Sequence, residues 1–195
     1  MSSPTIHRPS DTITTERLLL RALSPTDREG VFAIRSEPRV LYWTEPDTLE
    51  KSDEWLRIRL ESEKSMTYAV SLLPSTDNRC PQIIGVTGAH SLPEIGYIFH
   101  PSSWGHGYAT EALKAWIHMY WQRYPDGHPV LHESERAYLK AVTGPGGEGS
   151  RGVLRKCGFR WFREDEVCDE RKGAKEKGLS VVLQEFRLAR PGVEE

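Results

Sequence analysis

"EIGYIFHPSSWGHGYATEAL", residues 94–113, is the stretch that decides the fold. It begins as an apolar, strand-like run, breaks at Pro101 and passes through Gly105 and Gly107 before a helical pattern starts. A helix start leaves main-chain N–H groups unpaired at the positive end of the helix dipole, so a glycine turn there is typical of phosphate sites. The alternative is a plain turn in which the glycines serve packing only. Apolar residues three and four apart predict one buried stripe on this helix: Ala109, Ala112, Leu113, Trp116, Ile117 and Tyr120.

Two common phosphate motifs do not match the sequence. No GxxxxGK[ST] string occurs, and residues 105–110 read GHGYAT, so the third small residue of GxGxxG is a threonine. Several predicted strands also precede this one, whereas the dinucleotide motif opens an early βαβ unit. The stretch therefore predicts a main-chain anion site of another kind.

Composition excludes several classes of protein. The 195 residues include 26 Lys and Arg against 28 Asp and Glu, without the basic excess typical of nucleic-acid binding. No apolar run approaches the roughly 18 residues that span a bilayer, and the N-terminus lacks a signal-peptide pattern. Cys80, Cys157 and Cys168 show no CxxC spacing, and the histidines form no motif such as HExxH. We therefore expect a cytoplasmic protein without a disulfide framework and without a metal, nucleic-acid or membrane partner.

Periodicity and turn signals predict one α+β domain at residues 12–190, between short tails at 1–11 and 191–195. The predicted helices are 24–37, 49–64, 107–124 and 150–159. The predicted strands are 15–23, 67–73, 82–90, 94–100, 136–143, 160–167 and 179–188.

Four blocks in this order resemble the GCN5-related N-acetyltransferase (GNAT) superfamily. They are TTERLLLRAL, LYWTEPDTLEKSDEWL, the opening stretch and SRGVLRKCGF, at 14–23, 41–56, 94–113 and 150–159. The pattern is most similar to the branch of bacterial ribosomal-protein amino-terminal acetyltransferases and covers about residues 12–190. The resemblance implies a GNAT fold. This is a mixed, mostly antiparallel sheet of six to seven strands, splayed in the middle, with about four helices packed on both faces.

The resemblance also implies acetyl-CoA as the donor substrate. Strand 94–100 would separate from strand 136–143, and the pantetheine arm would lie in the gap. Main-chain groups of Ile98, Phe99 and His100 would pair with it, and one N–H would polarise the thioester carbonyl. The pyrophosphate would bind the loop before the long helix, at Trp104, Gly105, His106, Gly107, Tyr108, Ala109 and Thr110.

In this family an amine attacks the thioester directly, so it must first lose a proton. Glu94 is the first candidate for the base, with Glu133 and Glu135 as weaker candidates. Glu111, inside the long helix, is assigned a structural role. Ser150 matches a family serine that would hydrogen-bond the leaving thiolate, or it caps its helix.

Three positions depart from the family pattern. Ser102 stands where Gln or Arg is common, Gly147 where many members have Asn, and Leu154 where some have a tyrosine that acts as general acid. The alternative function is therefore an acetyl-CoA-binding module with little turnover that acts as a sensor or interaction protein.

The acceptor is expected to be an amine on a small molecule or a peptide. Tyr42, Trp43 and Glu45 are the candidate substrate-binding residues, together with the loop at 169–178. The sequence leaves the acceptor open among a peptide N-terminus, a lysine, a polyamine and an aminoglycoside. It also leaves open whether the protein is a monomer or a homodimer.

Overall fold

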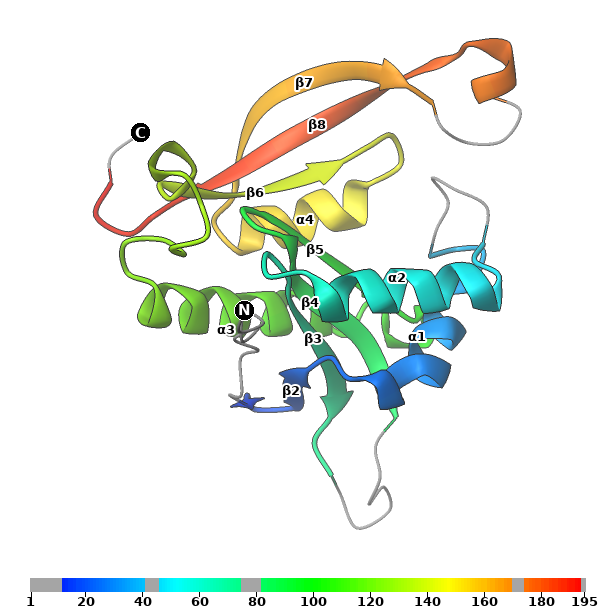
Figure 1. The fold of residues 1–195 in the computed structure, drawn as a ribbon, viewed down its shortest axis with the longest axis horizontal. Helices are drawn as coiled ribbons and strands as arrows, with labels where there is room; N and C mark the ends of the chain where they lie inside the picture. Colours follow the sequence, from blue (N-terminus) through cyan, green and yellow to red (C-terminus); the bar gives the residue numbers. More distant parts are fainter. Residues whose placement is uncertain (1–11, 41–45, 75–81, 170–173, 194–195) are drawn as a thin grey trace, which may run out of the picture.

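The structure, a computed structural model, describes residues 12–40, 46–74, 82–169 and 174–193. Within these ranges one sheet contains eight strands in the order β1-β2-β3-β4-β5-β6-β8-β7 (Figure 1). All neighbours are antiparallel except β5 and β6, which are parallel, so the predicted mixed α+β sheet is confirmed. The strands are β1 (Ile13–Thr14), β2 (Leu18–Ala22), β3 (Met66–Leu72), β4 (Ile83–Ser91), β5 (Glu94–Phe99), β6 (Tyr138–Thr143), β7 (Arg160–Cys168) and β8 (Ser180–Ala189).

The sheet has one strand more than the six to seven predicted. The additional strand is the two-residue β1, and β2 starts at Leu18 instead of residue 15. A turn separates the two, because the Thr15 N–H donates to the Leu18 carbonyl and the Leu18 N–H donates to Thr15 Oγ1, both at 2.9 Å. Side-chain hydrogen bonds of this kind compete with the strand ladder.

The described residues form four α-helices, as predicted. They are α1 (Arg28–Arg35), α2 (Leu49–Glu61), α3 (Tyr108–Arg123) and α4 (Glu148–Lys156). The start signature at Ser24 forms the 3-10 turn Pro25–Asp27 ahead of α1, with the Ser24 N–H donating to the Asp27 carboxylate at 2.8 Å. No helix in the described ranges is long and apolar enough to cross a bilayer.

Helices cover both faces of the sheet. On one face, Trp116 and Tyr120 of α3 and Leu154 of α4 are fully buried in the larger core cluster. On the other face, Val31 of α1 and Leu56 of α2 form a smaller cluster. The predicted stripe of α3 is confirmed at Ala112, Leu113, Trp116 and Tyr120, while Ala109 and Ile117 are half-buried.

Strand β5 sends side chains to both layers. Ile95 and Phe99 lie in the cluster under α3 and α4, whereas Ile98 packs against the cluster under α1 and α2. Successive strand residues alternate between faces, so Glu94 and Gly96 share the face of Ile98, and Tyr97 shares the face of Ile95. The candidate active-site residues of this strand are thereby divided between the two sides of the sheet.

Candidate active site

The sheet opens between β5 and β6. Strand β4 follows β5 from Gly85 opposite Phe99 to Ser91 opposite Glu94, but β5 meets β6 only where Glu94 pairs with Lys140. One further hydrogen bond, from the Lys140 N–H to the Pro93 carbonyl at 3.0 Å, lies at the same end. From there the two strands diverge, and β6, β8 and β7 run as a separate arm with α4 beside it (Figure 1). The splayed centre predicted for the sheet is confirmed.

A glycine turn lies at the open end of this gap. Gly105 and Gly107 have φ values of 78° and 81°, in the left-handed region that favours glycine. A Cβ added at Gly105 would meet no atom within 4 Å, so its main chain is open to a ligand. The first intrahelical donor of α3 is the Glu111 N–H, which bonds the Gly107 carbonyl at 3.1 Å. The N–H groups of Tyr108, Ala109 and Thr110 precede it, and together these features fit a diphosphate.

Arg17 and Glu111 fix this turn to the start of β2. Glu111 accepts hydrogen bonds from Thr15 Oγ1 at 2.6 Å and from Arg17 Nε at 2.8 Å. Arg17 Nη1 donates to the His106 carbonyl at 3.0 Å, and its guanidinium lies 4.7 Å from the centre of the Tyr108 ring. These contacts agree with the structural role expected of Glu111. No signal in the sequence indicated that Arg17 would hold the glycine turn, because its partners Glu111 and His106 are 94 and 89 residues away in the sequence.

Internal bonds use some of the main-chain groups predicted for the pantetheine arm. The Trp104 indole N–H donates to the Phe99 carbonyl at 2.7 Å, and the His100 N–H donates to the Ile84 carbonyl at 2.9 Å. The His100 N–H is therefore already paired, and only the carbonyl of that residue remains. Ser102, the first departure from the family pattern, lies with its Oγ 2.8 Å from His100 Nδ1.

Glu94 lies at the closed end of the gap, on the face of α1 and α2. Its carboxylate is 3.2 Å from His90 Nε2 and 3.0 Å from Lys140 Nζ. The hydrogen bond from His90, together with that from Lys140, lowers the pKa of Glu94 to about 2 against the opposing effect of burial. Glu94 is therefore ionised at neutral pH, and three neighbouring strands, β4, β5 and β6, each provide one member of this group.

Ser150 lies on the opposite face, in the first turn of α4, and touches Tyr97 of β5. Tyr97 Oη is 2.8 Å from both the carbonyl oxygen and Oγ of Ser150. Since the carbonyl can only accept, Tyr97 donates to it, and Ser150 is then the donor in the second contact. Burial raises the pKa of Tyr97 well above its ordinary value, with the Ser150 hydrogen bond opposing, so its hydroxyl stays protonated.

Comparison with known proteins assigns this arrangement to a family. Residues 17–160 match the family described as "Acetyltransferase (GNAT) domain". The chain belongs to the GNAT acetyltransferases. A Bacillus subtilis relative, the uncharacterized protein YkkB, is 27% identical over 160 residues, which cover 77% of this chain and 86% of the relative.

Solved structures of GNAT proteins share the fold at low sequence identity. A Bacillus anthracis GNAT acetyltransferase has a TM-score of 0.67 and 19% identity, covering 92% of this chain and 99% of that one. The Salmonella typhimurium enzyme that modifies the N-terminal serine of ribosomal protein L7/L12 has a TM-score of 0.69 and 13% identity, with coverages of 92% and 99%. The microcin C7 self-immunity acetyltransferase MccE, solved with acetyl-CoA and AMP, has a TM-score of 0.63 and 14% identity, with coverages of 90% and 93%. Ribosomal-protein acetyltransferases among these neighbours agree with the branch suspected from the sequence.

Some of the other residues predicted for the active site of this GNAT protein lie away from the gap between β5 and β6. The turn Glu133–Glu135 precedes β6, so it lies beyond the closed end, and Glu133 is exposed. Leu154, where some members have a tyrosine, is fully buried in the core. Tyr42, Trp43 and Glu45 lie outside the described residues. The described residues contain no group of three or more His, Cys, Asp or Glu side chains that could hold a metal.

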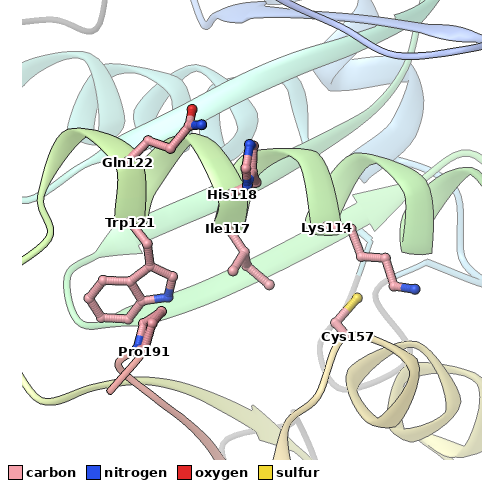
Figure 2. A pocket seen from close by; sticks show the side chains of 7 residues that line it. All are labelled: Lys114, Ile117, His118, Trp121, Gln122, Cys157 and Pro191. Atoms are coloured by element: carbon pink, nitrogen blue, oxygen red, sulfur yellow. The ribbon is translucent and has the colours of Figure 1, made fainter. Parts of the chain in front are cut away.

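A separate surface groove of about 410 Å³ lies along the later part of α3 (Figure 2). It is lined by Lys114, Ile117, His118, Trp121, Gln122, Cys157 and Pro191. In Figure 2 the side chains of Lys114, Ile117 and Trp121 project from α3 toward Cys157, just after α4, and Pro191, just after β8. None of the lining residues belongs to the glycine turn or to the β5–β6 gap, so this groove is distinct from the candidate site described above.

Proposed function

We propose that this protein is an acetyl-CoA-dependent N-acetyltransferase that transfers the acetyl group directly to an amine in a ternary complex. The observation that carries the proposal is the position of the glycine turn at the start of α3. It lies at the end of β5 where that strand is no longer paired with β6. A diphosphate at the turn and an extended amide-containing arm along β5 would each meet main-chain groups. Acetyl-CoA supplies the activated thioester, and the protein supplies the groups around it.

The glycine turn would hold the pyrophosphate through the main chain of residues 104–110. Arg17 and Glu111 support this role because they fix the turn before any ligand arrives, which lowers the entropy lost on binding. The departures at Ser102 and Gly147 fall on side chains, whereas the chief donors are main-chain groups. Acetyl-CoA binding therefore does not require the family's usual residues there.

On the α1 and α2 face, we assign proton removal from the amine to the pair Glu94 and His90. A free amine has a pKa of about 8 to 10, and a carboxylate whose pKa is about 2 is a weak acceptor for its proton. The contact to Glu94 uses Nε2 of His90, so the second ring nitrogen is left to accept a proton. Glu94 would thus hold the His90 ring in place, while His90 takes the proton. Lys140 keeps Glu94 ionised.

On the α3 and α4 face, we assign the leaving thiolate to Ser150. Its hydroxyl, which donates to Tyr97 in the described structure, would turn to the sulfur when the thiolate forms. Tyr97 would act as a positioning residue, because its bond to the Ser150 carbonyl fixes the first turn of α4. This pair provides a hydroxyl donor although Leu154 replaces the family's tyrosine.

The acceptor is proposed to be an amine on a peptide or a small molecule, in a cytoplasmic protein that is a monomer or a homodimer. Similarity to a ribosomal-protein acetyltransferase and to MccE supports amines of both kinds. The second candidate function, an acetyl-CoA-binding module with little turnover, is favoured by Leu154 and by the ion pairs that hold Glu94.

Calorimetric titration of the purified chain with acetyl-CoA, CoA and NAD tests the proposal. We expect micromolar binding of acetyl-CoA and CoA and no binding of NAD. A screen of amines with a free-thiol assay then separates the two candidate functions: thiol release that depends on an amine supports the enzyme, and binding without release supports the module. If acetyl-CoA does not bind at all, the glycine turn has no phosphate-binding role and serves packing only.

A further inference from the structure

We propose that the acceptor carries an oxyanion, a carboxylate or a phosphate, in addition to its amine, and that Arg59 of α2 binds it. This inference rests on the proposed function and names the substrate class of the same site. It is carried by a cluster of charged side chains between α1 and α2 in which, among the described residues, one carboxylate faces two guanidinium groups.

The cluster consists of two arginines, one aspartate and one tryptophan. The guanidinium groups of Arg35 and Arg59 lie 4.6 Å and 3.7 Å from the centre of the Trp55 ring. Asp47 is the carboxylate of the cluster, and it pairs with Arg35 Nε at 2.6 Å. The side chains of Arg35 and Asp47 are only 12% and 7% exposed, so this pair is closed to other partners. One positive charge, that of Arg59, therefore remains.

An arginine typically binds an oxyanion through its Nε and one Nη, and this edge of the Arg59 guanidinium is not used. Its Nη1 donates to the Trp55 carbonyl at 3.2 Å, while its Nε is buried and has no hydrogen-bond acceptor. Arg17 and Arg28 of the same chain each present Nε and Nη2 together to a carboxylate, those of Glu111 and Asp53. The corresponding edge of Arg59 would bind a carboxylate or phosphate in the bidentate way that Arg28 binds Asp53, once the side chain turns toward it.

The unpaired state of Arg59 is unfavourable. Burial, with the charge of Arg35 added, lowers the pKa of Arg59 to about 9, and Asp47 offsets this only in part. A buried donor without an acceptor lowers stability by about 1–3 kcal/mol. Such a residue is better explained by a ligand than by packing, because an apolar side chain of similar length would fill the same space without the unpaired charge.

The position of α2 places this charge on the acceptor's side of the sheet. Leu56, three residues before Arg59, packs in the cluster that includes Ile98 of β5, and Ile98 shares a face with Glu94. The chain just after α2 is bonded to the turn before β5, because the Leu92 N–H donates to the Lys64 carbonyl at 2.9 Å. An amine that reaches Glu94 and His90 from this face therefore has the rest of its molecule near α2.

Steady-state kinetics with matched acceptors tests this inference. The probes are ω-amino carboxylic acids of increasing chain length with the corresponding ω-amino amides, and aminoalkyl phosphates with the corresponding alkylamines. We expect kcat/KM to favour the anionic member at one chain length by roughly tenfold or more, the usual worth of a charge-assisted hydrogen bond. Arg59→Met should remove that preference and leave kcat/KM for the neutral member within about twofold, through a change in KM. Whether the acids or the phosphates lose more identifies the oxyanion.

Arg57→Met is the matched control, because Arg57 lies on the same helix, is more than half exposed and pairs with Glu54 and Glu61. It should keep the preference for the anionic acceptor. Equal kcat/KM for anionic and neutral amines in the wild type, or an equal loss for both in Arg59→Met, would overturn the inference.

Thermal unfolding gives a readout that does not need turnover. We expect Arg59→Met to have a Tm equal to or above that of the wild type. We also expect sulfate or succinate to raise the Tm of the wild type more than that of the variant. A lower Tm for Arg59→Met with no difference in the anion response would show a packing role and refute the anion site. Failure of the proposed function is distinguishable, because it appears as absence of acetyl-CoA binding with the anion response intact.

Discussion

Tyr97 Oη lies 2.8 Å from Ser150 Oγ and thereby joins β5 to the first turn of α4, on the far side of the opening between β5 and β6. Glu94, three residues earlier on β5, faces the other layer of helices. The two chemical tasks of acetyl transfer, removal of a proton from the amine and support of the thiolate, are thus proposed on opposite faces of one strand.

The Tyr97–Ser150 pair predicts a non-additive loss of turnover. Tyr97→Phe should lower kcat roughly tenfold or more and change the KM for acetyl-CoA little, because the hydroxyl acts on the orientation of Ser150. Ser150→Ala should lower kcat at least as much as Tyr97→Phe does. The double variant should lower kcat no more than Ser150→Ala alone. Steady-state kinetics checks this, with Tyr124→Phe at the end of α3 as the control. Independent, multiplicative losses would show that the two hydroxyls do not act together.

The left-handed glycines predict a loss of acetyl-CoA affinity on substitution. At Gly107 an alanine would be strained at φ 81° and would place a Cβ beside the main-chain donors, so we expect affinity to fall at least tenfold. Stability should also fall, by about 1 kcal/mol. Valine at this φ would be more strained still, because its Cβ is branched, so alanine is the substitution of choice.

Gly178→Ala provides the matched control for this prediction. Gly178 has a φ of 64° and open space around it, but it lies in the segment between β7 and β8. Calorimetry and thermal unfolding should show the same loss of stability and unchanged acetyl-CoA affinity. If both variants bind acetyl-CoA like the wild type, the pyrophosphate assignment fails.

Arg17 is predicted to act on affinity through the glycine turn. Arg17→Met removes the bonds to Glu111 and to the His106 carbonyl, so the turn must be ordered by the ligand itself. We expect acetyl-CoA to bind several-fold more weakly, with a more unfavourable entropy in calorimetry. Arg28→Met, which breaks a similar bidentate bond to Asp53, is the control and should bind normally. Normal affinity in Arg17→Met would mean that the turn is rigid without it.

The Glu94–His90 pair is predicted to control turnover. Glu94→Gln and His90→Gln should each lower kcat by roughly a hundredfold, within the usual range for acid–base catalysis, and leave acetyl-CoA affinity unchanged. His118→Gln on α3 serves as the histidine control. Assays with an amine of low pKa, which needs no base, should show a smaller loss. Full activity of Glu94→Gln would move proton removal to another group.

The lowered pKa of Glu94 predicts how its contribution to stability depends on pH. The folded-state pKa of about 2 lies below the unfolded value of about 4.3, so the ionised form is favoured by folding. This contribution, on the order of 2 kcal/mol, is complete above pH 4.3 and is lost as the pH falls toward 2. Denaturant unfolding of the wild type and Glu94→Gln should therefore differ at pH 7 and converge near pH 2. A difference that is constant with pH would assign it to packing.

The sequence by itself determined most of the helices and strands and the glycine turn before α3. The spacing of three and four in α3, the Ser24 start signature, and the glycines before α3 act over a few residues, so each could be predicted from its neighbours. The resemblance of ordered blocks added the family and the pair of strands that separates, while the parallel orientation of that pair came from the structure.

Tertiary structure decided which side chains meet. Arg17 reaches Glu111, Tyr97 reaches Ser150, and His90 and Lys140 reach Glu94 only because the sheet order places distant segments side by side. Tertiary structure also decided the charge state of Glu94 and left Nε of Arg59 without a hydrogen-bond acceptor, because both depend on burial and on neighbouring groups. Local sequence fixes backbone conformation through short-range sterics, whereas the properties of a site depend on neighbours that only packing supplies.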